Sequence, residues 1–231
     1  MTAFDIHPTL ILDLDGTLVD SAVTITSTLN LMRDRERLPP LDLEAVKPFI
    51  SLGAEKLLEA TLPYQTKDSQ TKLKEFRRIY LEAEIHSDNL FEGVANTLIS
   101  LRSLGVRLAI CTNKPRLLTE KTLQATGIAQ QFDCIVCGSE ALNDKPAPDQ
   151  LLLILEILGS QRQDCLFVGD TRVDHEASLA ADIPFMYFPS GYDPEINWID
   201  SVLQFPTQSF SPQIILETFE HMRGFNVSSG S

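Results

Sequence analysis

Short apolar runs alternate with longer stretches of helical periodicity over most of the chain. Five runs have the length of buried strands, at positions 10–12, 108–111, 134–137, 166–168 and 185–188. Helices are expected at 95–104, 117–126, 149–158 and 175–181, and near the end of the chain at 214–222. Gly105, Gly127 and Gly159 follow the first three helices, as glycine commonly does at helix C-termini. Strands that alternate with helices form right-handed crossovers, so the pattern predicts an α/β fold with a parallel sheet.

The segment between the first two strands has little strand character and carries many charges. Helical stretches are expected at 22–37, from Asp42 onward, at 53–62 and at 72–85. An acidic residue such as Asp42 is typical of a helix start. We therefore expect a helical cap domain at 19–86, inserted into a core that is formed by 1–18 and 87–231.

Composition allows such a core and limits the classes of partner. The chain has 231 residues, of which 43% are hydrophobic, enough for one large domain with a smaller insert. Its formal net charge of −13 and pI near 4.7 leave no basic stripe for nucleic acid or for an anionic membrane. No apolar run reaches the roughly 18 residues of a membrane span. An anionic ligand must therefore be held by local lysines, amide groups or a metal.

The four cysteines are expected to be buried and structural. Cys134 and Cys137 form a CxxC pattern, but no second pair or nearby histidine pair completes a redox or zinc site. Free cysteines fit a reducing cytoplasm, and residues 1–8 lack the basic region of a signal peptide. We therefore expect a cytoplasmic protein, whose oligomeric state the sequence leaves open.

Polar and charged residues gather where the predicted strands end. They are Asp13 and Asp15 after the first strand, Thr112 and Asn113 after the second, Lys145 before a helix, and Asp170 and Asp174 after the fourth. The carboxyl ends of parallel strands share one edge of a sheet, where open α/β sheets bind their ligands. The sequence therefore predicts one site with several acids, a lysine, a hydroxyl and an amide.

Two acids as close as Asp13 and Asp15 are costly to bury, because each raises the pKa of the other unless a cation or hydrogen-bond donors neutralise it. The alternative is a polar strand exit in which Asp15-Gly16 is an ordinary turn. Asp174 lies one helical turn beyond Asp170 on the same face, and its alternative role is to cap the following helix. Carboxylate oxygens with open positions suit Mg²⁺.

Four ordered motifs carry a resemblance to a known family. They are DLDGTL at 13–18, TNK at 112–114, the lysine before proline at 145–146, and GDTRVD at 169–174. In this order they resemble the haloacid dehalogenase superfamily of aspartate-nucleophile phosphohydrolases, over essentially the whole chain. The residues at 20–21, 112–115, 145–149 and 191–192 look most like those of the phosphoglycolate phosphatase group of that superfamily.

The resemblance implies a Rossmann-like parallel sheet core with an inserted helical cap, and it implies a role for each acid. Asp13 would be the nucleophile and a metal ligand, and Asp15 the general acid and base, with its backbone carbonyl on the metal. Asp170 would bind Mg²⁺, and Asp174 would bind the metal or a metal-bound water. Lys145 would neutralise charge on the nucleophile and on the transferring phosphoryl group.

The resemblance also bears on the substrate. Thr112, Asn113 and Lys145 are expected to bind the phosphoryl group, whereas Lys114 is expected to point to solvent or to the edge of the cap, and Tyr192 to serve in packing. The implied activity is a Mg²⁺-dependent phosphatase of small phosphorylated metabolites, with 2-phosphoglycolate as the first candidate substrate. The alternatives are a pyrophosphatase, a nucleotidase or a sugar phosphomutase of the same fold, and a catalytically idle binding or regulatory protein.

The sequence departs from the pattern of this group at two places. The cap turn at 50–53 keeps only the second glycine of a Gly-x-Gly pattern, as Gly53, and Asp182 stands where a glycine usually ends the helix after the fourth motif. Asp182 is expected in the left-handed conformation, which Asp tolerates better than most residues. Because cap residues would contact the leaving group, the change in the cap turn affects the expected substrate more than the expected chemistry.

Overall fold

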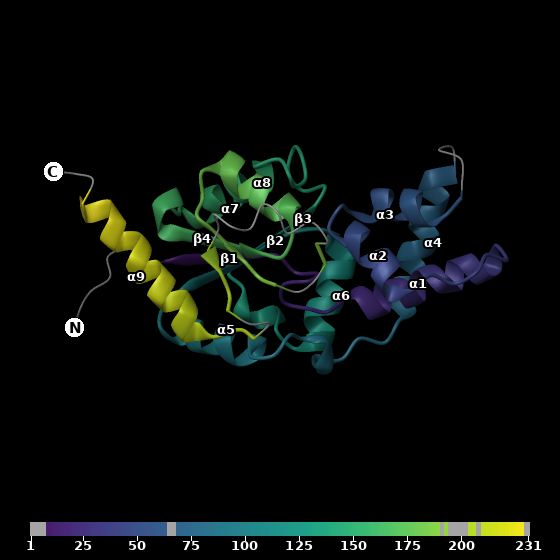
Figure 1. The fold of residues 1–231 in the computed structure, drawn as a ribbon, viewed down its shortest axis with the longest axis horizontal. Helices are drawn as coiled ribbons and strands as arrows, with labels where there is room; N and C mark the ends of the chain where they lie inside the picture. The colour runs from purple at the N-terminus through teal and green to yellow at the C-terminus, as the bar shows by residue number, and fades with distance from the viewer. Residues whose placement is uncertain (1–7, 64–67, 190–191, 194–202, 207–208, 229–231) are drawn as a thin grey trace.

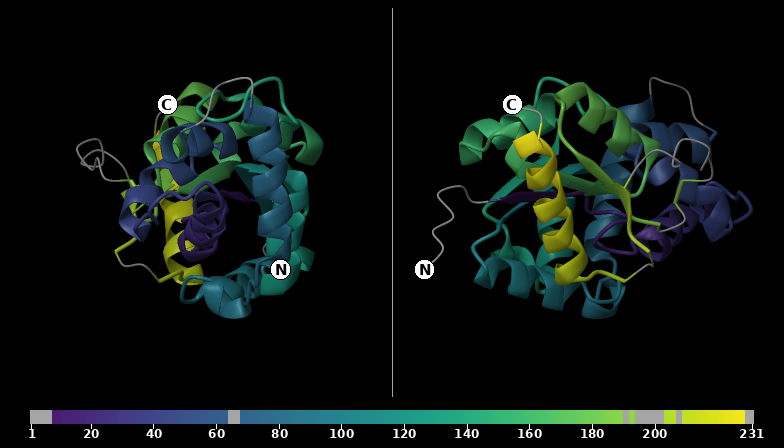
Figure 2. Two further views of the ribbon diagram at one scale, coloured as in Figure 1. Left: turned by 90° about the vertical axis from the view of Figure 1, so that its right-hand side faces the viewer. Right: turned by 60° about the vertical axis from the view of Figure 1, so that its left-hand side comes forward.

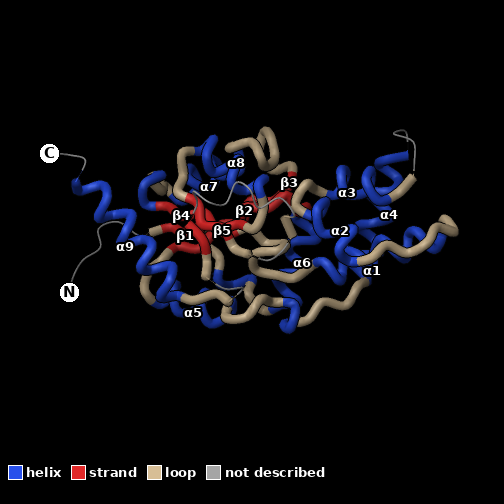
Figure 3. The backbone as a smooth tube through the Cα atoms, in the orientation of Figure 1, coloured by secondary structure: helices blue, strands red, loops and turns tan. Residues whose placement is uncertain are grey.

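The computed structural model describes residues 8–63, 68–189, 192–193, 203–206 and 209–228. Within these ranges, a parallel sheet with the strand order β3-β2-β1-β4-β5-β6 lies at the centre (Figures 1 and 3). Its strands are β1 (Thr9–Leu12), β2 (Arg107–Pro115), β3 (Cys134–Gly138), β4 (Cys165–Gly169), β5 (Phe185–Tyr187) and β6 (Leu203–Gln204). The five predicted strands are confirmed. The sixth, β6, consists of two exposed residues, which is too short a pattern to predict.

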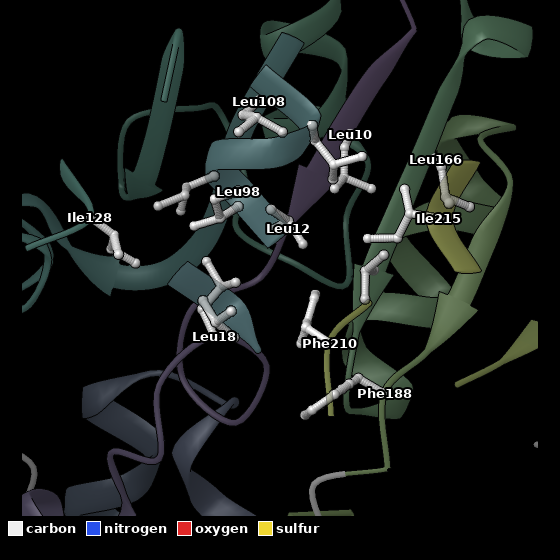
Figure 4. Close-up of a cluster of buried hydrophobic side chains, with 14 of the residues drawn as sticks. Leu10, Leu12, Leu18, Leu98, Leu108, Ile128, Leu166, Phe188, Phe210 and Ile215 are labelled. Atoms are coloured by element: carbon white, nitrogen blue, oxygen red, sulfur yellow. The ribbon is translucent and has the colours of Figure 1, made fainter. Parts of the chain in front are cut away.

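Each face of the sheet is covered by its own helices. Alternate residues of β1 point to opposite faces, so Leu10 and Leu12 belong to one apolar core (Figure 4) and Ile11 to the other. The helices are α5 (Val94–Ser103), α6 (Arg116–Thr126) and α9 (Pro212–Ser228) on the first face, and α7 (Asp149–Leu158) and α8 (Arg172–Ala181) on the second. Short 3₁₀ helices span Ser87–Asn89, Ala129–Gln131 and Arg162–Asp164. Figure 2 shows α9, in yellow, crossing the first face.

The order of the strands brings the predicted site segments together. β1 lies between β2 and β4, and its last residue, Leu12, pairs with Ile110 and Val168. The chain therefore leaves β1 beside the ends of β2 and β4. Because β2 and β4 lie on opposite sides of β1, this edge is a topological switch point, the place where open α/β sheets bind ligands.

A group of helices lies beyond this edge of the sheet (Figure 1). They are α1 (Ala22–Arg35), α2 (Leu43–Ile50), α3 (Ala54–Thr61) and α4 (Ser69–Glu82). They share an apolar core that includes Leu29, Leu58 and Phe76, and Leu118 of α6 and Tyr192 also belong to it. Lys121 of α6 donates a hydrogen bond to the backbone carbonyl of Tyr80 at 3.1 Å, which ties α4 to the sheet-bearing part. These helices occupy the segment in which the cap is expected, while its boundaries at 19 and 86 stay a prediction.

Several local expectations are confirmed. All four cysteines are buried and free, and burial raises the pKa of Cys165 to about 12, so that this thiol stays protonated at neutral pH. Asp182 ends α8 in the left-handed conformation, with a φ of 55°. None of the described helices has the length and apolarity that crossing a membrane requires.

Candidate active site

The turn after β1 places two acids at the end of the sheet. Asp13 and Asp15 are only 3% and 7% exposed. Gly16 follows with a φ of 85°, and a Cβ at this position would lie 2.2 Å from Oδ2 of Asp170. Only glycine fits this approach, so the turn brings β1 against the end of β4. This close contact argues against an ordinary surface turn at Asp15-Gly16.

Lys145 lies between two of the acids. Its Nζ donates hydrogen bonds to Oδ1 of Asp13 at 2.8 Å, to Oδ1 of Asp174 at 2.6 Å, and to the carbonyl of Cys111 at 2.8 Å. Burial lowers the pKa of Lys145, but the charges of Asp13 and Asp174 raise it more, so its pKa lies above the ordinary value. Burial raises the pKa of Asp13 to about 7, and Lys145 counters part of that rise.

The acids of the fourth motif complete the cluster. Asp170 is fully buried and accepts a hydrogen bond from the hydroxyl of Thr17 at 2.9 Å. Asp174 accepts hydrogen bonds from the backbone N–H and the hydroxyl of Thr171, at 3.1 and 2.7 Å, through its Oδ2. This is a capping box at the start of α8. Asp174 therefore has the capping role that the sequence offered as an alternative, and its other oxygen binds Lys145.

The donor set of this cluster fits a divalent cation. Carboxylate oxygens of Asp13, Asp170 and Asp174 lie within 4.8 Å of one another. With Asp15, the described site holds four carboxylates against two lysine ammonium groups, which leaves a formal charge of −2. Oxygen ligands and excess negative charge are what hard cations such as Mg²⁺ require.

Thr112 and Asn113, near the end of β2, make contacts within the protein that the sequence did not predict. Thr112 is buried at the end of the sheet, and its Oγ1 accepts the N–H of Lys114 at 3.2 Å. The Asn113 amide group donates to the carbonyls of Lys145 at 2.9 Å and Ser51 at 3.2 Å, and its oxygen accepts the N–H of Lys145 at 3.0 Å. The side chain of Asn113 therefore holds the Lys145 backbone and touches the cap turn. A contact of Thr112 or Asn113 with phosphoryl oxygens stays a prediction.

Lys114 lies at the edge of the cap, one of its two expected positions, but it also reaches an acid of the site, which the sequence did not predict. Lys114 is only 7% exposed, and its Nζ donates to the two carboxylate oxygens of Asp15 at 2.8 and 3.1 Å. The ammonium group also lies 4.5 Å from the centroid of the Tyr80 ring, on α4.

Lys114 lies in β2, which continues to Pro115. The pairing of β2 with β3 shifts register between Cys111 and Pro115, so strand alternation does not fix the direction of Lys114. Its position in the TNK motif, next to Thr112 and Asn113, was the signal in the sequence that could have identified it.

The described residues also line a partly open cavity of about 30 Å³ between α1–α4 and the sheet. Asp15 and Lys114 form its polar wall, together with Asn113. The other lining residues are Ile25, Ile50, Gly53, Ala54, Leu57, Phe76, Tyr80, Pro115 and Leu118. The cavity therefore adjoins the acid that the resemblance identifies as the proton donor.

Tyr192 packs in the apolar core it shares with α1–α4, as expected, and it has a polar role as well. Its hydroxyl donates to Oδ1 of Asp20 at 2.6 Å and accepts the N–H of Ala22 at 2.8 Å. It thus fixes the chain where the turn after β1 passes into α1. The adjacent Gly191, which contributed to the resemblance, lies outside the described residues.

The sheet, the acids at its edge and the helical insert define a class of protein. The family model of the haloacid dehalogenase-like hydrolases matches residues 10–188, and the chain belongs to this family. It is 34% identical over 203 residues to the phosphoglycolate phosphatase of Escherichia coli (strain K12), with 78% of this chain and 81% of that protein covered. The phosphoglycolate phosphatase of Shigella dysenteriae serotype 1 matches to the same extent.

Solved structures agree on the fold. A crystal structure of a predicted phosphoglycolate phosphatase from Haemophilus somnus 129PT has a TM-score of 0.82 at 24% identity, and the match covers 94% of this chain and 100% of that one. The β-phosphoglucomutase of Clostridium difficile has a TM-score of 0.76 at 17% identity, with coverages of 94% and 98%. The Rossmann-like α/β fold is therefore confirmed. At these identities the structures bear on the fold alone.

Proposed function

We propose that this protein is a Mg²⁺-dependent phosphatase of small phosphomonoesters, with 2-phosphoglycolate as the first substrate to test. The observation that carries the proposal is the position of Asp13: a buried carboxylate at the carboxyl end of the central strand, 2.8 Å from Lys145 and beside Asp170. Curated relatives at 34% identity are phosphoglycolate phosphatases, which supports this activity.

Asp13 would act as the nucleophile. One of its oxygens forms a bond to phosphorus while the bond from phosphorus to the ester oxygen breaks, and Asp15 gives its proton to that leaving oxygen. The product is an aspartyl phosphate and a free alcohol. Asp15 then takes a proton from a water molecule, which attacks phosphorus and releases Asp13 and inorganic phosphate. One difficult displacement is thus divided into two easier ones.

The other groups of the site would stabilise charge during these steps. Lys145, hydrogen-bonded to Asp13, would neutralise negative charge on the nucleophile and on the phosphoryl oxygens. Thr112 and the backbone of Asn113 would donate to the phosphoryl group from the end of β2. The helices α1–α4 would form the cap that covers the leaving group and excludes water.

Mg²⁺ would be held by carboxylate oxygens of Asp13 and Asp170 and by the backbone carbonyl of Asp15. Asp174 would act through a metal-bound water, because both of its oxygens already accept hydrogen bonds in the described site. When bound, the ion supplies charge neutralisation at the transferring phosphoryl group. We further propose a cytoplasmic location, which the free, buried cysteines support.

The test compares wild type with Asp13→Asn. The amide is nearly isosteric but is a poor nucleophile, so the variant should fold and yet lose hydrolysis of p-nitrophenyl phosphate and of 2-phosphoglycolate. Wild type should require Mg²⁺, and beryllium fluoride should trap an adduct on Asp13. Appreciable activity in Asp13→Asn protein free of wild-type contamination would remove the nucleophile assignment. A panel of phosphorylated metabolites, sugar phosphates and pyrophosphate included, would rank the alternatives by kcat/KM.

A further inference from the structure

The cavity beside Asp15 is lined by a few polar groups on one side and by apolar side chains elsewhere. Four of the described side chains that line the cavity carry a polar group. They are Asp15, Asn113, Lys114 and, through its hydroxyl, Tyr80. That hydroxyl lies 3.1 Å from the hydroxyl of Thr122, and both ends of the Asn113 amide are hydrogen-bonded. The remaining lining side chains are apolar. The cavity therefore offers few groups that could satisfy the hydroxyls of a sugar.

Lys114 is the only cation among the described residues that line this cavity. It is buried, it pairs with Asp15, and its ammonium group faces the Tyr80 ring of α4. Phosphoryl transfer to Asp13 does not require a second cation at the position of Lys114, because Lys145 already neutralises the charge of Asp13. A buried lysine is costly to desolvate, so its presence beside the expected leaving group requires a reason.

We propose that Lys114 is the specificity-determining residue for the leaving group: its ammonium group binds the carboxylate of a small 2-hydroxy acid ester such as 2-phosphoglycolate. This inference rests on the proposed phosphatase function and assigns the residue that selects its substrate. Asp15 would face the leaving oxygen, and the Lys114 Nζ lies 2.8 Å from Oδ1 of Asp15. In such an ester the carboxylate is attached to the carbon that carries the leaving oxygen, which brings it to the ammonium group. An ammonium group has three donors, so it can bind a second carboxylate beside Asp15.

The inner part of the cavity has room for a small acid. A cavity needs about 10–15 Å³ to hold one water molecule, so a volume of about 30 Å³ suits a group of two or three heavy atoms. The carboxylate of a two-carbon acid is of this size, whereas a second phosphate or a sugar ring is larger. The apolar side chains of Leu57 and Phe76 would contact its methylene group and keep water from the ion pair.

The experiment measures the preference for a carboxylate directly. The kcat/KM values for 2-phosphoglycolate and for 2-hydroxyethyl phosphate are compared, because the second ester has the same two-carbon leaving group with CH₂OH in place of the carboxylate. We expect wild type to prefer 2-phosphoglycolate by about 30-fold or more, the smallest usual effect of a buried charge pair. Lys114→Met should remove most of this preference, mainly through a higher KM for 2-phosphoglycolate.

Two further variants separate charge from packing. Lys114→Arg keeps a cation and should retain part of the preference, whereas Lys56→Met, at an exposed position on α3, should keep the wild-type ratio. The ratio of the two esters is the readout, because damage to Asp15 or to the fold would lower both rates alike. Equal losses on both esters in Lys114→Met, or an arginine variant that loses the preference as fully as the methionine variant, would overturn the assignment.

Failure of this inference can be told from failure of the proposed function. If wild type hydrolyses both esters with Mg²⁺ but does not prefer 2-phosphoglycolate, the phosphatase stands and the role of Lys114 is wrong, whether or not any variant folds. A preference for a bisphosphate ester over 2-phosphoglycolate would likewise contradict a carboxylate site. If wild type hydrolyses neither ester nor p-nitrophenyl phosphate, the phosphatase proposal falls, and this inference with it.

Discussion

Replacement of Lys145 by methionine should destabilise the protein strongly, and more so at higher pH. The side chain is 2% exposed, and its ammonium group binds Asp13 at 2.8 Å and Asp174 at 2.6 Å, both of them almost fully buried. Methionine fills a similar volume but leaves two buried carboxylates without their cation. Breaking a buried ion pair by removing one partner costs about 3–5 kcal/mol. For a chain of this length, 1 kcal/mol corresponds to about 2–4 °C in Tm, so we expect a fall of roughly 6–20 °C.

The pH dependence of that loss follows from the direction of the pKa change. Burial raises the pKa of Asp13 to about 7, even with Lys145 present. Without the lysine the pKa rises further. Between the ordinary pKa near 3.8 and the raised value, the folded state binds more protons than the unfolded state, so stability falls as the pH rises through this range. The loss in Lys145→Met should therefore be smaller at pH 5 than at pH 8.

The assay is thermal and urea unfolding of wild type and variant in EDTA at pH 5 and pH 8. Lys47→Met is a matched control, because Lys47 pairs with the exposed Glu44 at 2.7 Å and such pairs contribute about 0–1 kcal/mol. A Lys145→Met protein within 1 kcal/mol of wild type at pH 8 would refute the reasoning, since the two carboxylates would then be tolerated without a cation. A loss that is independent of pH would refute the argument from Asp13.

Three further outcomes are expected. Asp15→Asn should lower kcat for alkyl phosphates by about 10² to 10⁴ and by less for p-nitrophenyl phosphate, whose leaving group needs less protonation; equal losses would contradict its role as the acid. Thr17→Val removes the 2.9 Å hydrogen bond to Asp170 and should weaken Mg²⁺ binding, measured by isothermal titration calorimetry, about 10- to 100-fold. An unchanged affinity would contradict a role of this hydrogen bond in orienting Asp170 for the metal. Because protons compete with the metal for Asp13, whose pKa is near 7, the rise in Tm on adding Mg²⁺ should be larger at pH 8 than at pH 5.5, and an equal rise would be inconsistent with that pKa.

Much of the fold and of the acidic cluster could be predicted because both depend on local patterns. A run such as 10–12 is too short for a helix and too apolar for a loop, and Asp13 directly follows it. The order of the strands then brings Asp170 beside Asp13 without any knowledge of side-chain contacts. The contact that was not predicted depends on tertiary geometry. Lys114 pairs with Asp15, 99 residues away, and it lies in the irregular end of β2, which continues to Pro115.

The same limit applies to polar side chains whose partners are set by packing. Thr17 could be identified as part of a motif, but its hydrogen bond to Asp170 depends on the turn that Gly16 permits. The phosphoryl contact expected for Asn113 stays a prediction, and the sequence did not show that the side-chain amide holds Lys145 and touches Ser51. A sequence shows which donors are available near a strand end, but it does not show which of several acceptors each one meets.

The net charge of −13 would by itself repel an anionic phosphate ester, yet the local arrangement makes such a ligand acceptable. Charges on the exposed surface are screened beyond about 8–10 Å at physiological ionic strength, whereas Lys114 and Lys145 are buried at the site and are screened much less. Both lysines are paired with acids in the described structure, and the four acids outnumber them, so the site as a whole does not attract an anion before a metal binds. The formal charge of −2 left by the four acids is cancelled when one divalent cation binds. Metal binding should therefore precede productive substrate binding, and the KM for a phosphate ester should fall as Mg²⁺ increases toward saturation.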